Sequence, residues 1–351
     1  MTSLFDSLRI GAMTAPHRVV MAPMTRNRAT SAGVPTDLMA EYYAQRASFG
    51  LIISEGVQPA AIGQGYPHTP GAHNDEQTAG WKRVAGAVHS AGGHIFLQLM
   101  HAGRISHFDV TGMEPVAPSA VTPVGEIFTG AGTKPFEKPR AMSADDLVSA
   151  RDSFVDAAKR AIAAGCDGVE LHAASGYLLN QFLADNSNQR TDAYGGSPEN
   201  RARFVIETVQ AVAMAVGGEK VSIRISPNGT FNDMALTHIE ETYGALLAGI
   251  DSLGLAYLHV GEEPGFSGIK FSRAHWSGVL IGNTGYADND KIGSAHALVE
   301  SGNADAVSFG RLALANPDLP RRIKDGQAMN EPDSKTFYSG GEKGYTDYPA
   351  L

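Results

Sequence analysis

The chain contains a single cysteine, Cys166, among its 351 residues. One thiol excludes an intrachain disulfide and an iron–sulfur cluster held by four cysteines. Cys166 lies between an expected helix end and an expected strand, which favours buried packing over a nucleophilic role. No metal site is predicted.

Long apolar runs and blocks of basic residues are also missing. No stretch reaches the roughly 20 apolar residues of a transmembrane helix, and the first residues lack the basic and apolar regions of a secretory signal. The net charge of -9 comes without a basic block, which argues against nucleic acid as a partner. We expect a cytoplasmic protein, monomeric or homo-oligomeric, that binds neither membranes nor nucleic acid.

No early turn carries the G-x-G-x-x-G sequence that an open, doubly wound dinucleotide-binding sheet predicts. The chain instead alternates eight short apolar runs with longer helical patterns, and 43% of its residues are hydrophobic. The expected strands are 18–23, 51–56, 94–99, 168–172, 220–225, 256–260, 279–282 and 306–309. This pattern predicts a single (β/α)8 TIM barrel domain over residues 1–351.

The connections between these strands have a helical pattern, with one exception. Helices are expected at 36–48, 75–91, 143–164, from 198 onward, at 237–253 and at 290–300. Ser143 and Ser197 are suitable N-cap residues, and Pro198 fits the first helical position. Residues 100–142 are rich in Gly, Pro and Thr. This excursion after the third strand is predicted to form loops or a hairpin that caps the barrel mouth.

Polar side chains lie at the expected strand ends, where TIM barrels carry their chemistry. They are Thr25, Gln98, His172 and Arg224. Burying such groups without partners is costly, and a flat heteroaromatic ligand with carbonyls and ring nitrogens, such as a flavin, would satisfy them. Arg224 would then stabilise negative charge on the reduced ring. The alternative is an internal ion pair of Arg224 with Glu55 or Glu170.

The last two strands end in glycine-containing turns, Thr284-Gly285 and Gly310-Arg311. Loops after the seventh and eighth strands of this barrel often bind phosphate. Glycines let backbone N–H groups approach an anion, and arginine can bind it with two hydrogen bonds. A phosphorylated ligand is therefore predicted; the alternative is a left-handed turn next to a surface arginine.

The run from His172 to Phe204 resembles the Old Yellow Enzyme family of flavin mononucleotide (FMN) oxidoreductases. The resemblance spans nearly the whole chain, including 21–26 at the first strand and 336–349 near the end. It implies FMN as cofactor, NADPH or NADH as hydride donor, and activated alkenes as substrates. The implied reaction is ping-pong: NAD(P)H reduces the flavin and leaves before an α,β-unsaturated carbonyl or nitro compound binds.

The resemblance also implies residue roles. His172 would donate a hydrogen bond to the activating oxygen of the substrate, and Tyr177 would donate a proton to its α-carbon. The implied cofactor contacts are Pro23, Met24, Thr25, Gly56, Gln98, His172, Arg224, Thr284, Gly285, Gly310 and Arg311. The implied substrate contacts are Tyr66, Met100, Asn232 and Tyr338.

Three positions depart from the family pattern, all of them on the substrate side. Ser175 stands where the family usually has His or Asn as a second donor to the substrate oxygen, and serine is shorter. Met100 stands where Trp is frequent, and Asn232 replaces a frequent polar partner. Ser175 predicts weaker or shifted activity on simple enones compared with a Ser175→Asn variant. Met100 predicts a larger or softer substrate pocket, with a plain packing substitution as the alternative, while the flavin side is intact.

Three other functions remain open from the sequence. The same flavin site could reduce nitrate esters or nitroaromatics. A flavin-free, phosphate-binding barrel enzyme could use Glu55 or Glu170 at a strand end. A catalytically silent flavoprotein is the third alternative, which Ser175 favours and which His172 and Tyr177 oppose.

Overall fold

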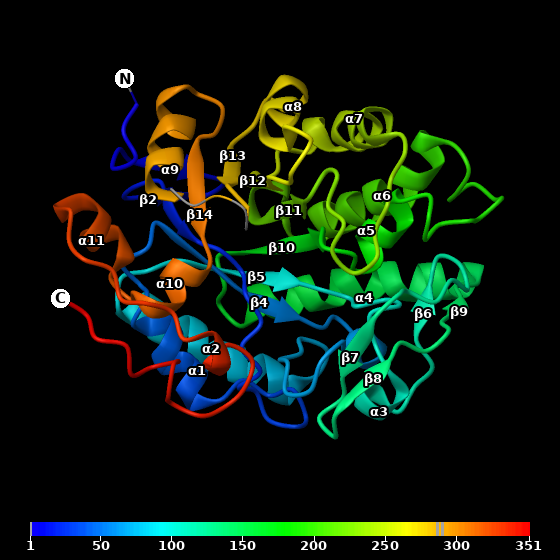
Figure 1. Ribbon diagram of the computed structural model, residues 1–351, viewed down its shortest axis with the longest axis horizontal. Coiled ribbons are helices and arrows are strands. Elements are labelled where there is room, and N and C mark those ends of the chain that lie inside the picture. The colour runs from blue at the N-terminus through cyan, green and yellow to red at the C-terminus, as the bar shows by residue number, and fades with distance from the viewer. Residues whose placement is uncertain (1, 286–287, 289–290) are drawn as a thin grey trace.

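A closed barrel of eight parallel strands forms the centre of the protein, with helices packed around it (Figure 1). The computed structural model describes residues 2–285, 288 and 291–351. The barrel strands follow one another in chain order: β3 (Val19–Met21), β4 (Leu51–Val57), β5 (Ile95–Leu99), β10 (Gly168–Ala173), β11 (Val221–Ile225), β12 (Tyr257–Gly261), β13 (Leu280–Asn283) and β14 (Ala306–Phe309). Because β14 pairs with β3, the sheet has no open edge. The predicted TIM barrel is confirmed.

The long outer helices begin at the expected capping residues. Ser143 caps α4 (Ala144–Ala163) in a capping box with Asp146, and Ser197 caps α6 (Pro198–Val216). The other helices are α1 (Asp37–Ala44), α2 (Asp75–Ser90), α3 (Phe108–Thr111), α5 (Leu178–Leu183), α7 (Ile239–Ile250), α8 (Gly268–His275), α9 (Lys291–Glu300), α10 (Arg311–Ala315) and α11 (Leu319–Asp325), with 3-10 turns at Ala61–Gly63, Gly218–Lys220, Asp251–Leu253 and Ser334–Thr336. The first predicted helix is shorter than expected, and position 290 of the predicted 290–300 helix lies outside the described residues.

A hairpin that precedes the barrel was not predicted. Its strands β1 (Leu8–Ile10) and β2 (Met13–Ala15) pair antiparallel, and Ile10 and Met13 pack with residues near the amino-terminal ends of the barrel strands. Among these partners are Val20, Leu51, Phe96 and Tyr257. The hairpin therefore covers one end of the barrel with apolar contacts, so ligands are left with the carboxyl-terminal end.

The excursion after β5 reaches the opposite end of the barrel, as predicted. It contains a parallel pair, β6 (Val116–Ala117) with β9 (Arg140–Ala141), and an antiparallel hairpin, β7 (Glu126–Phe128) with β8 (Thr133–Pro135). Phe136, just after the hairpin, packs together with Tyr66 against the buried cluster formed by Met100, Ala102, Ile105 and Tyr177. This contact places the excursion over side chains that come from strand-end loops.

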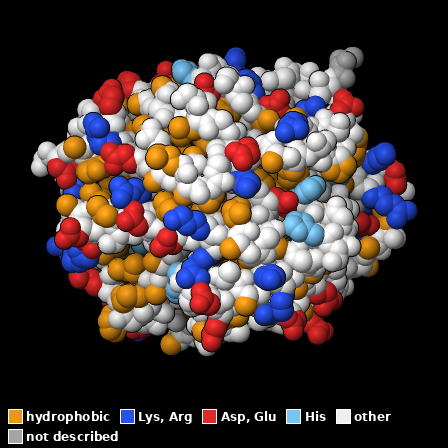
Figure 2. All heavy atoms as spheres, turned by 180° about the vertical axis from the view of Figure 1, so that it is seen from behind, with side chains coloured by type: hydrophobic (Ala, Val, Ile, Leu, Met, Phe, Trp, Pro, Cys, Tyr) orange, Lys and Arg blue, Asp and Glu red, His pale blue; other side chains and the backbone are white. Residues whose placement is uncertain are grey.

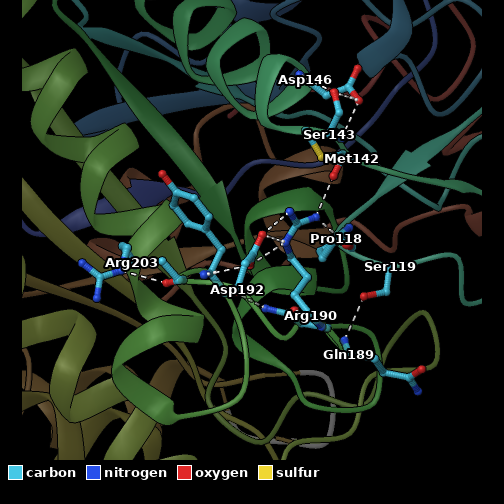
Figure 3. A network of polar contacts seen from close by, with 12 residues as sticks. Pro118, Ser119, Met142, Ser143, Asp146, Gln189, Arg190, Asp192 and Arg203 are labelled. Atoms are coloured by element: carbon cyan, nitrogen blue, oxygen red, sulfur yellow. Dashed lines mark hydrogen bonds and ion pairs between the residues drawn. The ribbon is translucent and has the colours of Figure 1, made fainter.

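Arg190 fastens the excursion to the loop that follows α5 (Figure 3). Its Nη1 donates to the carbonyl oxygens of Pro118 at 3.0 Å and Met142 at 2.7 Å, while Asp192 binds the other side of the guanidinium. The backbone N–H of Gln189 donates to Ser119 Oγ at 2.9 Å. The polar motif around Arg190 is therefore a structural clamp that holds the middle of the excursion, at Pro118 and Ser119, and its end, at Met142.

The outer surface carries charge of both signs. On the face seen in Figure 2, Lys and Arg side chains alternate with Asp and Glu side chains without a large block of either sign. Within the described residues, no helix combines the length and the apolar character that crossing a membrane requires.

Candidate active site

Barrel closure brings the predicted polar side chains to one end of neighbouring strands. His172 on β10 is in register with Arg224 on β11, and Arg224 is in register with His259 on β12. One layer below, Gln98 on β5 is in register with Glu170 on β10. Register partners on parallel strands lie side by side, so these residues form a continuous polar surface inside the barrel mouth.

His172 and Arg224 present buried polar atoms without a protein partner. The exposed fraction of His172 is 7%, and its Nδ1 has no hydrogen bond among the described residues, nor does Nε of Arg224. Burial, followed by the electrostatic effects of the nearby Arg224 and His259 side chains, holds the pKa of His172 well below its usual value. The imidazole is therefore neutral at physiological pH and can donate one hydrogen bond while accepting another.

Arg224 is not part of an internal ion pair in the described part of the chain, so the alternative pairing with Glu55 or Glu170 is wrong. Glu170 binds His259 at 2.9 Å and Gln98 at 2.8 Å, and Glu55 binds the backbone N–H of Arg26 and the hydroxyl of Tyr43. An unpaired guanidinium beside a neutral imidazole fits a planar ligand with several acceptor atoms, as a flavin ring provides. The donor set therefore fits FMN.

Tyr177 and Tyr66 meet beside His172. Their hydroxyl oxygens are 3.1 Å apart, and the rings of His172 and Tyr177 have centroids 5.0 Å apart. Burial raises the pKa of Tyr66, which stays protonated at neutral pH. Met100 is buried against the same pair, which places it on the predicted substrate side.

Ser175 occupies a left-handed backbone conformation, with φ of +57°. Its N–H donates to Ser226 Oγ at 3.1 Å, and its carbonyl oxygen accepts from Asn232 Nδ2 at 2.8 Å. The amide of Asn232, a predicted substrate contact, is thus engaged with the backbone of Ser175. The hydroxyl of Ser175 has no hydrogen bond within the described residues.

The first two barrel strands place the predicted flavin contacts Pro23, Met24, Thr25 and Gly56 at one side of the site. Pro23, Met24 and Thr25 follow β3 and are half-buried. A Cβ on Gly56 would lie 2.7 Å from Sδ of Met100, so any larger residue there would force the Met100 side chain to move. Gly56 therefore links the predicted flavin side to the predicted substrate side through Met100.

The residues predicted to bind a phosphate follow the neighbouring strands β13 and β14. Gly285 has φ of +77°, and a Cβ there would lie 2.4 Å from the carbonyl oxygen of Glu262. Thr284 and Gly310 are half-buried, and Arg311 is exposed at the start of α10. Sequence reasoning missed Lys291, which donates to the carbonyl oxygen of Gly285 and is a second cation at this end.

Tyr338, the last predicted substrate contact, lies on the carboxyl-terminal segment. Its side chain is 56% exposed, and its carbonyl oxygen accepts from Asn27 Nδ2 at 3.0 Å. The two neighbouring arginines, Arg26 and Arg28, donate to the carbonyl oxygen of Phe337. Residues 26–28, which follow the predicted flavin contact Thr25, therefore hold the backbone around Tyr338 in place.

The sequence and structure of the chain are similar to those of known flavoenzymes. The profile of the NADH:flavin oxidoreductase / NADH oxidase family matches residues 3–330. A probable flavin mononucleotide-dependent alkene reductase of Leishmania infantum is 43% identical over 99% of this chain and 97% of its own, and 12-oxophytodienoate reductase 7 of Oryza sativa subsp. japonica is 39% identical over 99% and 94%.

Solved structures agree with these sequence relatives. The old yellow enzyme homologue from Zymomonas mobilis superposes with a TM-score of 0.96 at 41% identity, over 99% of this chain and 100% of that one. Morphinone reductase in complex with tetrahydroNAD superposes with a TM-score of 0.94 at 46% identity, over 100% of this chain and 98% of that one. The chain belongs to the NADH:flavin oxidoreductase / NADH oxidase family and is an FMN-dependent oxidoreductase of the Old Yellow Enzyme type.

Proposed function

We propose that this enzyme uses NADPH or NADH to reduce the C=C bond of alkenes conjugated to a carbonyl or nitro group. The observation that carries the proposal is the neutral, buried His172, whose Nδ1 has no partner in the described structure, next to Tyr177. An oxygen that gains negative charge needs a positioned donor, and the adjacent carbon needs an acid. The two side chains supply both. The relatives named alkene reductase, 12-oxophytodienoate reductase and morphinone reductase support the same class of substrate.

The chain's own residues divide the work of binding and proton transfer. When bound, FMN supplies the hydride chemistry of the reaction. Gln98, Arg224 and Thr25 would hold its ring. Its phosphate would be held by Thr284, Gly285, Gly310 and Arg311. Further contacts to the cofactor would come from Pro23, Met24 and Gly56.

On the substrate side, His172 polarises the double bond through the activating oxygen, and Tyr177 protonates the α-carbon. Tyr66 lies within hydrogen-bonding distance of the Tyr177 hydroxyl and orients it. Met100 and Tyr338 would form walls of the substrate space, while Asn232 supports the Ser175 backbone.

Turnover with two kinds of acceptor tests this function. Purified holoenzyme, bleached anaerobically with NADPH or NADH, is expected to regain its flavin absorbance when cyclohexenone is added, with the saturated ketone as product. Rapid reoxidation by a nitrate ester without reoxidation by cyclohexenone would instead support the nitrate-ester reductase. A colourless protein that FMN cannot restore would contradict both functions.

Ser175→Asn is expected to increase kcat/KM for cyclohexenone. Asparagine tolerates the left-handed backbone conformation at this position and brings a longer donor toward the substrate oxygen. A regained donor to a developing oxyanion is worth up to about 3 kcal/mol of barrier. Steady-state kinetics of the two proteins check this.

Ser175→Ala serves as the matched control, because it removes a hydroxyl that has no hydrogen bond in the described structure. Its kcat/KM should stay near that of the parent. A Ser175→Asn variant slower than the parent would contradict the prediction.

A further inference from the structure

A fully buried carboxylate lies beneath the candidate flavin site. Glu170 has no exposed surface, and each of its oxygens accepts one hydrogen bond. Gln98 Nε2 donates to Oε1 at 2.8 Å, and His259 Nδ1 is 2.9 Å from Oε2. Burying a charged carboxylate costs desolvation free energy, so we expect a role for Glu170 in the site above it.

The ionised carboxylate of Glu170 fixes which atoms donate and which accept in the surrounding hydrogen bonds. An ionised carboxylate can only accept, so His259 carries its proton on Nδ1 and its Nε2 accepts from Ser308 Oγ, 2.8 Å away. Ser308 Oγ in turn accepts from Asn283 Nδ2 at 3.0 Å. This series of hydrogen bonds therefore crosses from β13 to β14, then to β12 and β10, and it ends on the carboxylate of Glu170.

The charges in this layer are balanced. Burial raises the pKa of Glu170, but His259, Arg224 and Gln98 together hold it below its usual value. Burial lowers the pKa of His259, which is neutral. Glu170 is thus negative, Arg224 is positive, and the distance between them is too long for an ion pair.

The amide of Gln98 is oriented by the same carboxylate. Because its NH2 group donates to Glu170, its carbonyl oxygen is the atom left for a ligand, and that oxygen has no partner among the described residues. The site then presents an acceptor from Gln98 and donors from Arg224. This pairing complements a ring edge that carries both an N–H and carbonyl groups.

We propose that Glu170 is a positioning residue that sets the reduction potential and the affinity of bound FMN, through the charge of Arg224 and the orientation of Gln98. The proposal rests on the assignment of these two residues to the flavin. Electrons added to the flavin add negative charge, which Arg224 attracts and Glu170 repels. Glu170 therefore limits how strongly the site favours the reduced cofactor.

Glu170→Gln and Glu170→Asp separate charge from positioning. The glutamine variant keeps the shape and loses the negative charge, so its reduced FMN should be bound about tenfold more tightly relative to oxidised FMN. This corresponds to a midpoint potential about 30 mV more positive for the two-electron couple. The aspartate variant keeps the charge but is too short to reach Gln98, so its potential should stay near that of the parent while FMN binds more weakly.

Potentiometric titration and fluorescence titration of FMN measure these two effects. Glu55→Gln is the matched control, because Glu55 is also buried but accepts from the backbone N–H of Arg26 and from the hydroxyl of Tyr43. Its potential should not change. If the Glu170→Gln protein does not fold, His259→Leu removes a donor to the carboxylate, favours its protonation and should shift the potential in the same direction.

Arg224→Met separates this proposal from the flavin-site assignment. Loss of the positive charge should make the midpoint potential more negative. If Arg224→Met shifts it and Glu170→Gln does not, or if Glu55→Gln shifts it equally, the role of Glu170 is refuted and the site assignment stands. If Arg224→Met changes neither potential nor FMN affinity, the assignment of Arg224 itself fails.

Discussion

Replacing Tyr177 with phenylalanine is expected to slow the reduction of an activated alkene about 100- to 10,000-fold, the usual contribution of a positioned general acid. The phenol is buried beside His172, with its oxygen 3.1 Å from that of Tyr66. Phenylalanine keeps the packing against Met100 and Ile105 and removes only the proton donor. Stopped-flow reoxidation of the reduced enzyme by cyclohexenone measures the loss.

The reductive half-reaction is the internal control for Tyr177→Phe. Reduction by NADPH or NADH needs no proton from this phenol, so its rate should stay within a few-fold of that of the parent enzyme. A variant that reduces cyclohexenone as fast as the parent would show that another group supplies the proton, and Tyr66 is the nearest hydroxyl to test. In that case the role of Tyr177 would be packing.

Replacing Arg26 with methionine is expected to destabilise the protein by on the order of 3 kcal/mol and to loosen the carboxyl-terminal segment. Arg26 is fully buried, and its guanidinium donates to the carbonyl oxygens of Phe337 at 2.9 Å and Gly344 at 2.7 Å, and to the hydroxyl of Tyr42 at 3.0 Å. Methionine fills part of the space but removes the donor to the Gly344 carbonyl oxygen, and it leaves the Phe337 carbonyl oxygen with Arg28 alone. A lower midpoint of urea unfolding checks the stability.

Limited proteolysis checks the local effect of Arg26→Met. Cleavage near Tyr338 should become faster than in the parent, because the backbone of this segment has lost its two hydrogen bonds to Arg26. Arg321→Met removes an arginine that is 63% exposed and should leave both the midpoint and the cleavage rate unchanged. Equal behaviour of the two variants would contradict the anchoring role of Arg26.

Much of the barrel could be predicted because its signals are local. Apolar runs with turn residues on either side predict strands, and Ser143 and Ser197 mark helix starts by the hydrogen bonds that their side chains make within three residues. The first hairpin, at 8–15, was missed because each strand has only three residues. Strands this short carry too few alternating positions to stand out.

For the candidate site, the sequence identified several of the residues but not all of the contacts between them. The resemblance pointed to Tyr66, His172 and Tyr177, and the structure brings these three together. It did not predict that Asn232 would bind the Ser175 backbone or that Lys291 would reach Gly285. Both contacts depend on loop conformations that no periodic pattern in the sequence describes.

The sequence by itself determined the barrel, the capped helices and the side chains available at the strand ends, because periodicity and capping act over a few residues. Only the tertiary structure decided the partners and charge states of these side chains. Glu170 and His259 are 89 positions apart, and barrel closure makes them neighbours. Burial at that point leaves Arg224 unpaired and His172 neutral, since both depend on which charges surround them after folding.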